Sequence, residues 1–297
     1  MSTNSTLLVI AALIPAVALC VYVYAKDRVE KEPIGLLLAL FFAGVFIAFP
    51  VVRAEDGLSA LLNRSFAPLV IEAEGERYLS AVSYYLYLAC KNFFGIALAE
   101  EGGKFLVMYF ITRRNRNFNS LFDGIVYAVF VSLGFAALEN VFYVFTYGWG
   151  AAIARAVLSV PGHMFFAVFM GYYYSIWHIY SKANQTVAAL KMQGPLDFRA
   201  EEFPSRKYLA LSLILPACIH GYYDFCLDVN SWLSTLMFYA LTIFLYVFCF
   251  KRIRRASAGD ALESTITKNL IVRSFPQLAP VLDPAPRDDL FAPVTEK

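Results

Sequence analysis

The chain has 297 residues, of which 59% are hydrophobic and 16% charged, with a formal net charge of +2. An average soluble domain has about 45–50% apolar and about 25% charged residues, and a water-soluble globule of this size has no room inside for so much apolar surface. The composition therefore excludes a soluble enzyme, a disordered chain and a collagen-like fibre, and the small net charge gives no basis for nucleic-acid binding. It indicates several membrane-spanning helices.

Seven hydrophobic segments follow one another along the chain, most of them near the roughly 20 residues needed to cross about 30 Å of hydrocarbon. They cover residues 6–25, 34–52, 92–112, 121–147, 152–181, 208–227 and 232–250. A tyrosine-rich stretch, 79–91, precedes the third segment, and we interpret it as an interfacial or re-entrant lead-in because Lys91 interrupts the apolar run. The sequence predicts an all-α polytopic membrane protein, a bundle of about seven transmembrane helices.

Basic residues in the connections predict the orientation. Lys and Arg gather after the first, third, fifth and seventh segments, whereas the alternate connections carry only Arg53, Arg64 and Arg77. The positive-inside rule then places the N-terminus outside and the C-terminus in the cytoplasm. Residues 1–255 form the membrane domain. The tail, 256–297, is rich in Pro, Asp and Arg without an apolar period, so we expect it to be cytoplasmic and largely disordered.

Because there is no soluble catalytic domain, any chemistry must come from ionisable residues inside the spans, where a charge at mid-depth costs about 2.5–3.5 kcal/mol. Glu100 and Glu101 precede Lys104 at helical spacing, so either pair shares one helix face and can form an ion pair. Lys104 can hold one carboxylate as the anion, which leaves the pair suited to general-base catalysis on water. The same spacing suits a structural ion pair between helices, and spacing alone does not separate the two interpretations.

Polar residues on three further spans are candidates for the same site. Glu139 and Asn140 are adjacent near the end of one span, where the amide could donate to an oxyanion and the carboxylate could fix a neighbour, or both could simply link helices. His163 lies on the next span. His220 and Asp224 share a helix face on the following one, so the carboxylate can orient the imidazole.

Four residues on four spans fall in one layer. At about 1.5 Å of rise per residue they lie about 10–16 Å below the outer ends of their spans, provided that the third span begins near Asn92. They are Glu100, Glu139, His163 and His220. A shared depth favours one site over scattered structural contacts. Arg155, near an outer end, is expected to snorkel to the membrane surface.

Five motifs, in order on successive spans, resemble those of the PrsW family of bacterial intramembrane proteases, which is related to the CAAX-processing and bacteriocin-processing membrane proteases. They are Glu100-Glu101-Gly102-Gly103-Lys104, Phe122-Asp123-Gly124, Glu139-Asn140, His163-Met164-Phe165-Phe166 and His220-Gly221-Tyr222-Tyr223-Asp224. The resemblance covers about Ile96 to Asp224, so the motif core of a protease domain lies within 92–227. The first two spans and the tail lie outside it.

The resemblance implies a peptidase of a bacterial cytoplasmic membrane whose partners are the lipid bilayer and a membrane-anchored protein substrate, similar to an anti-sigma factor, cut on its extracytoplasmic side. Our hypothesis is that Glu100 or Glu101 activates a water, and that His163 and His220 position it and protonate the leaving amine. Asp224 would orient His220. The oxyanion would be bound by Asn140 or by a histidine.

Alternatives stay open at this point. The carboxylates and imidazoles could instead hold zinc, but we prefer a metal-free glutamic mechanism without a cofactor, because HExxH is absent and Lys104 supplies the charge that a cation would bring. A proton-coupled transporter would also gather such residues at one depth, although it would usually show two repeats with interrupted helices. An inactive membrane scaffold is the third possibility.

Overall fold

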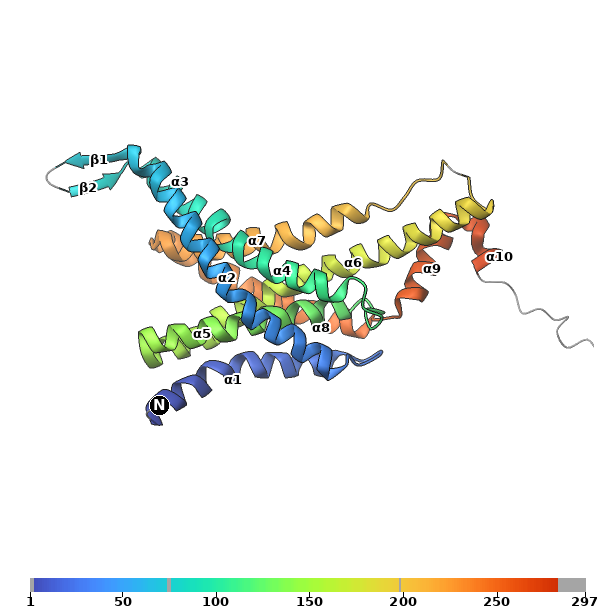
Figure 1. Ribbon diagram of the computed structural model, residues 1–297, viewed down its shortest axis with the longest axis horizontal. Coiled ribbons are helices and arrows are strands. Elements are labelled where there is room, and N and C mark those ends of the chain that lie inside the picture. The colour runs from blue at the N-terminus through green and yellow to red at the C-terminus, as the bar shows by residue number, and fades with distance from the viewer. Residues whose placement is uncertain (1–2, 74–75, 198, 283–297) are drawn as a thin grey trace, which may run out of the picture.

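The computed structural model describes residues 3–73, 76–197 and 199–282, and nearly all of this part of the chain is helical (Figure 1). The long helices are α1 (Thr3–Lys26), α2 (Ile34–Phe66), α4 (Leu98–Thr112), α5 (Asp123–Val157), α6 (Ser159–Gln193), α7 (Ser205–Val229) and α8 (Trp232–Ala258). Shorter elements are α3 (Ala81–Cys90), the π-helix η2 (Lys91–Ala97), α9 (Glu263–Ser274), α10 (Ala279–Leu282), the 3-10 turns η1 (Ala67–Leu69) and η3 (Pro276–Leu278), and the strands β1 (Val70–Ala73) and β2 (Glu76–Leu79).

Five helical stretches of the described chain are long and apolar enough to cross a membrane, and one of them, Asp123–Gln193, comprises both α5 and α6. The predicted all-α membrane bundle is confirmed. Two of the predicted segments end too early. The helix that begins the second segment continues from residue 52 to Phe66, and the helix of the fifth continues from residue 181 to Gln193.

The third predicted span begins earlier than expected. Ser80 caps α3 by accepting a hydrogen bond from the Ser83 amide (3.3 Å), and the helical path then runs through η2 into α4 without a break. The stretch 79–91 is therefore largely a regular helix that runs on into α4, and this helical path does not begin at Asn92. The depth estimate for Glu100, which counted from that residue, is wrong in its starting point.

Helix α5 forms the centre of the bundle and packs against α1, α2 and α6 (Figure 1). Every residue from Asp123 to Ala137 is buried, as expected for a helix that is apolar all round. The α2 backbone comes very close to α5 at Gly44, where a Cβ atom would lie 2.0 Å from the Val131 carbonyl oxygen. This close crossing fixes where α2 runs along the side of the bundle.

The tail is more ordered than its composition indicates. The start of α9 is tied to the loop before α5, because the Glu263 amide donates to the Asn119 carbonyl (2.6 Å). Ile271 of α9 packs with Val187 and Leu190 of α6. The prediction of a disordered tail is therefore wrong for residues 263–282, since a few apolar side chains suffice to dock a short helix on α6. Residues 283–297 lie outside the described residues.

The two ends of the molecule carry different structures. At one end, β1 and β2 form an antiparallel hairpin, with Val70 opposite Leu79, between the end of α2 and the start of α3 (Figure 1). At the other end lie α9 and α10. The hairpin makes α2 and α3 neighbours, which brings the second half of α2 and the start of the η2–α4 helix to the same side of the bundle.

Candidate active site

Helix α4 begins with an ion-pair cluster that is buried in the bundle. The Lys104 ammonium donates to Glu100 Oε2 (2.9 Å) and to Glu101 Oε1 (2.8 Å). Lys104 and Glu101 are completely inaccessible, and Glu100 is 6% exposed. The helical spacing of the sequence thus predicted both pairs correctly. A charge triad of this kind, with two carboxylates on one ammonium, keeps an anionic oxygen inside the apolar bundle at reduced electrostatic cost.

Lys104 also joins α4 to α6. Its Nζ lies 3.0 Å from His163 Nδ1. Because a lysine ammonium can only donate, Nδ1 must be the accepting nitrogen of the ring. The proton of a neutral His163 then sits on Nε2, which lies 2.9 Å from Glu139 Oε2. The chain of donors and acceptors therefore fixes the tautomer of His163.

Glu139 is held from two directions. It accepts from His163 and pairs with Arg155, whose Nη2 lies 3.0 Å from Glu139 Oε2. The Arg155 guanidinium also stacks over the Tyr143 ring, with 3.9 Å between its carbon and the ring centroid. Arg155 therefore points into the bundle, and the expectation that it snorkels to the surface is wrong, because Glu139 and Tyr143 give it a partner inside.

His220 of α7 lies between two carboxylates. Its Nδ1 is 3.0 Å from Glu101 Oε1, and its Nε2 is 3.2 Å from Asp224 Oδ2, as the helical spacing of His220 and Asp224 predicted. The ring stacks on Phe166 with 4.6 Å between centroids, and its centroid is 5.6 Å from that of His163. The ring can donate to both carboxylates at once only as an imidazolium.

A close helix contact places His220. At Gly221 a Cβ atom would lie 2.8 Å from the ring and 2.9 Å from the Cα atom of Phe93. Phe93 belongs to the π-helix η2, which leads into the first turn of α4, where Glu100 and Glu101 lie. A π-helical turn inserts an extra residue into the helix and often marks a functional site. Glycine at 221 lets α7 approach this turn, so that His220 reaches Glu101.

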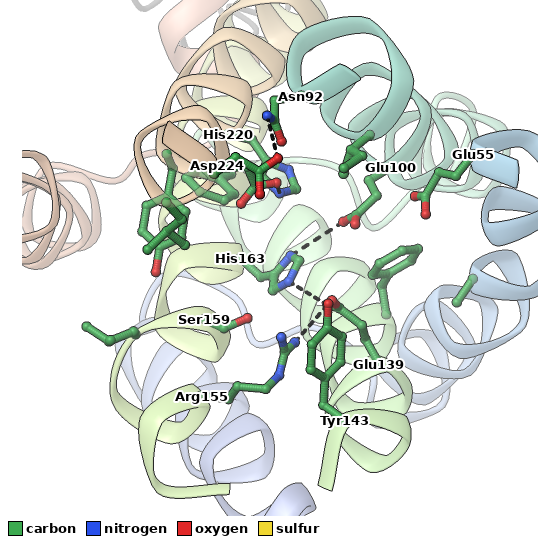
Figure 2. A pocket seen from close by; sticks show the side chains of 18 of the residues that line it. Glu55, Asn92, Glu100, Glu139, Tyr143, Arg155, Ser159, His163, His220 and Asp224 are labelled. Atoms are coloured by element: carbon green, nitrogen blue, oxygen red, sulfur yellow. Dashed lines mark hydrogen bonds and ion pairs between the residues drawn. The ribbon is translucent and has the colours of Figure 1, made fainter. Parts of the chain in front are cut away.

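A cavity of about 660 Å³ opens beside this cluster. Figure 2 shows the side chains that face it from α4, α5, α6 and α7. They include Glu100, Glu139, His163, His220 and Asp224, together with Arg155, Tyr143 and Ser159. Glu101 is not among the lining residues, and its Oε2 is buried without a hydrogen-bond partner among the described residues. Of the two adjacent glutamates, Glu100 is therefore the one that a substrate or water in the cavity can reach.

Asn140, like Glu101 and Lys104, is a predicted site residue that does not line the cavity. Its amide donates to the Ala12 carbonyl (2.8 Å), and its Oδ1 accepts from Arg155 Nε (3.0 Å). Asn140 thus links α5 to α1 and positions Arg155. The structure does not support the alternative in which Asn140 binds the oxyanion, because its amide is already committed to the backbone of α1.

Four polar residues of the cavity wall were not predicted from the sequence to belong to the site: Glu55, Lys91, Asn92 and Asp228. Glu55 lies on the part of α2 beyond the predicted segment end, and so looked like a residue of an exterior loop. Lys91 forms an ion pair with Asp228 at 2.9 Å, and the Asn92 amide donates to the same oxygen at 2.9 Å. The interruption of the apolar run by Lys91 was a usable signal, since a cation there needs a partner on another helix.

The geometry also tests whether the cluster fits a metal ion. Glu100, Glu101 and His163 each offer a ligand atom, all within 4.8 Å of one another, and carboxylate and imidazole are ligands that zinc accepts. However, all three side chains already accept a hydrogen bond from the Lys104 ammonium, at 2.8–3.0 Å. A divalent ion held by the same side chains would lie against Nζ, where like charges repel. The residues as arranged therefore do not fit a metal.

The chain is similar to a family of membrane proteases and to individual members of it. The family model described as PrsW family intramembrane metalloprotease matches residues 32–250. The chain is 35% identical to "Protease PrsW" of Geobacillus kaustophilus over 220 residues, which is 74% of this chain and 79% of that protein. It is 31% identical to "Protease PrsW" of Oceanobacillus iheyensis over 252 residues, or 85% of this chain and 97% of that protein.

A third relative, "Protease PrsW" of Bacillus subtilis, is 30% identical over 255 residues, which is 85% of this chain and 97% of that protein. No solved structure matches the chain. The family match extends beyond Ile96–Asp224 in both directions. The second span, α2, lies within it, contrary to expectation, whereas the first span, α1, lies outside it as expected.

Proposed function

This chain belongs to the PrsW family of intramembrane metalloproteases, and from that membership we propose that it is an endopeptidase that cuts membrane-anchored proteins at the cavity described above, with a glutamate as the general base. One observation carries the proposal. Glu100 lines the cavity while Lys104 holds one of its oxygens, and both histidines of the cluster line the same cavity. A base, a source of protons and room for a peptide thus occur together.

Glu100 is our candidate for the base that activates water. Lys104 keeps its carboxylate anionic in an apolar setting, and the carboxylate faces the cavity. His163 lies beside it, with Nδ1 3.9 Å from Glu100 Oε2, and helps to position the water. Glu101 would act through others: it binds both Lys104 and His220 and so orients the base and the second histidine.

His220 is our candidate for the acid. As an imidazolium between Glu101 and Asp224 it can stabilise the oxyanion of the tetrahedral intermediate and then protonate the leaving amine. The hydroxyl of water joins the acyl carbon, the carbon–nitrogen bond breaks, and the proton taken by Glu100 replaces the one that His220 gives. Glu139 and Arg155 position His163.

The residues of this chain supply these steps without a metal. The family description names metalloproteases, but Lys104 places a positive charge among the side chains that would bind one, so we derive no step through a metal. Purified protein should keep its activity after exhaustive treatment with a chelator. Loss of activity that added zinc restores would overturn the glutamic assignment.

The substrate would be a bacterial single-span membrane protein, similar to an anti-sigma factor, cut on its extracytoplasmic side. The basic residues that follow the first, third, fifth and seventh segments support an orientation with the N-terminus outside. In this orientation the hairpin end of α2, near which Lys91 and Asp228 line the cavity, faces the exterior. Labelling of single cysteines placed at Ser231, expected outside, and at Ser257, expected inside, tests the orientation.

Co-expression with candidate single-span membrane proteins tests the activity. The wild type should cleave a substrate that Glu100→Gln and His220→Ala leave intact at equal expression. Glu72→Gln, which removes an exposed carboxylate of the hairpin, is the matched control and should cleave normally. Cleavage by the Glu100 and His220 variants at wild-type rates would contradict the proposal and favour a transporter or a scaffold.

A further inference from the structure

The cavity contains one carboxylate that the proposed mechanism does not use. Glu55 lies on α2 and lines the cavity, and Figure 2 shows it beside Glu100, across the pocket from His220 and Asp224. It is half-buried, and its Oε1 is completely buried without a hydrogen-bond partner among the described residues. A buried oxygen of this kind normally has a partner, since leaving it unpaired is costly.

The other carboxylates in the cavity wall are already paired. Glu100 binds Lys104, Glu139 binds Arg155, Asp224 binds His220 and Asp228 binds Lys91. Among the described residues every cation that reaches this cavity is therefore already bound to an acid, and none is within ion-pair distance of Glu55. The wall of the cavity that α2 forms therefore carries a carboxylate without a cationic partner.

Charged residues of both signs act on the Glu55 carboxylate. Glu100 and Glu139 repel its charge, whereas Lys104 and His220 attract it from beyond hydrogen-bonding distance. A cation that entered the cavity beside α2 would therefore gain from Glu55 and from the neighbouring acids, while an anion would be repelled. Away from the chain ends, where an endopeptidase cuts, the permanently charged cations of a polypeptide substrate are its lysine and arginine side chains.

We propose that Glu55 is a specificity residue that receives a lysine or arginine side chain of the substrate, a few residues from the bond that is cut. This inference rests on the proposed protease function. Glu55 and Glu100 wall the same cavity of about 660 Å³, so a peptide whose scissile bond is at Glu100 passes α2 within a short stretch of extended chain. Glu55 takes no part in the proton transfers.

A scan of basic residues in a membrane-anchored reporter tests the inference. The probe is a single-span reporter with a segment at the outer membrane boundary in which each position in turn carries Lys, Gln or Glu. The wild type should cut the Lys form about tenfold faster than the Gln form at one position, the scale expected for one close charge pair. Glu55→Gln should remove this difference while it cuts the Gln form at the wild-type rate, and Glu55→Asp should retain part of it.

Charge reversal provides the second arm. Glu55→Lys should prefer Glu at the same position of the reporter. The matched control is Asp56→Asn, which neutralises the adjacent, exposed carboxylate that pairs with Arg53, and it should keep the preference for Lys.

The outcomes separate the two proposals. If the wild type cuts no reporter, the protease function itself fails. If it cuts the Lys and Gln forms equally, or if Glu55→Gln keeps the preference, the specificity role is wrong while the protease stands. An equal loss with every reporter in the Glu55→Gln variant would also overturn it, since a proton-donating or structural role predicts that result.

Discussion

Lys104 Nζ lies 3.0 Å from His163 Nδ1, so one buried ammonium joins the glutamates of α4 to the histidine of α6. Through Glu101 the same group is linked to His220 of α7, which lies 3.0 Å from that glutamate. Three helices therefore meet at a single positive charge. The role of Lys104 in the proposed mechanism is to hold the base anionic and to fix the tautomer of His163.

Replacing Lys104 by methionine should abolish cleavage and destabilise the protein. Two buried carboxylates would lose their cation, and breaking a buried ion pair by removing one partner costs about 3–5 kcal/mol. Thermal unfolding in detergent together with the reporter cleavage assay measures both effects. Lys91→Met is the control, because its pair with Asp228 is about one-third exposed and should contribute about 0–1 kcal/mol. Equal melting temperatures for Lys104→Met and the wild type would contradict the buried triad.

Substitutions of the two adjacent glutamates should differ in their effects on cleavage and stability. Glu100→Gln should lower cleavage by about 10²-fold or more, as expected for a lost general base, with little change in stability because Lys104 keeps Glu101 as a partner. Glu101→Gln should reduce both activity and stability, since it breaks contacts with Lys104 and His220 in a fully buried position. The comparison requires cleavage rates and melting temperatures of both variants. If Glu100→Gln keeps its activity while Glu101→Gln is stable and inactive, the two roles are reversed.

Contacts within one helix were predictable from the sequence. The pairs Glu100–Lys104 and His220–Asp224 follow from the rise and turn of an α-helix, and both occur in the structure. The hydrophobic segments likewise predicted the membrane bundle, because the period of apolar residues needs no tertiary information.

Which side chains pair with one another across helices was not predictable, since spacing says nothing of how one helix is rotated against another. Arg155 looked like a snorkelling residue until α5 and α6 brought Glu139 beside it. Glu55 was missed because a charged stretch appeared to end the span, whereas α2 continues to Phe66. The prediction of a disordered tail was wrong for a related reason. The few apolar residues of the tail pack on a surface that only the folded α6 provides.

Gly221→Ala should disrupt the site without touching a charged group. The new methyl group would collide with the backbone of Phe93 at 2.9 Å, which must push α7 away from η2 and His220 away from Glu101. We expect a loss of activity of at least tenfold and a destabilisation of about 1–3 kcal/mol, as is typical of overpacking. The control is Gly102→Ala on α4, where no atom lies within 4 Å of the new Cβ, and normal cleavage is expected. A fully active Gly221→Ala variant would mean that α7 tolerates a shift at His220.

The end of the molecule opposite the hairpin should make stability depend on pH. Burial, and then the negative charge of Asp123, raise the pKa of Glu32 in the α1–α2 connection from 4.5 to about 8. Burial also raises the pKa of its neighbour Asp27. Between about 4.5 and about 8 the folded protein therefore holds a proton on Glu32 that the unfolded chain has released. Stability should fall as the pH rises through this window and level off above it.

Glu32→Gln isolates this contribution, because the amide resembles the protonated acid and does not titrate. The variant should match the wild type in melting temperature near pH 4.5 and exceed it increasingly up to about pH 8. Glu30→Gln, at an exposed neighbouring carboxylate that accepts from the Asn119 amide at 2.8 Å, should follow the wild-type pH profile. In Glu32→Gln, stability should depend on pH less steeply than in the wild type but should still depend on it, because Asp27 is unchanged. A variant that is less stable than the wild type at pH 8 would show that the Glu32 carboxylate is bound there as an anion.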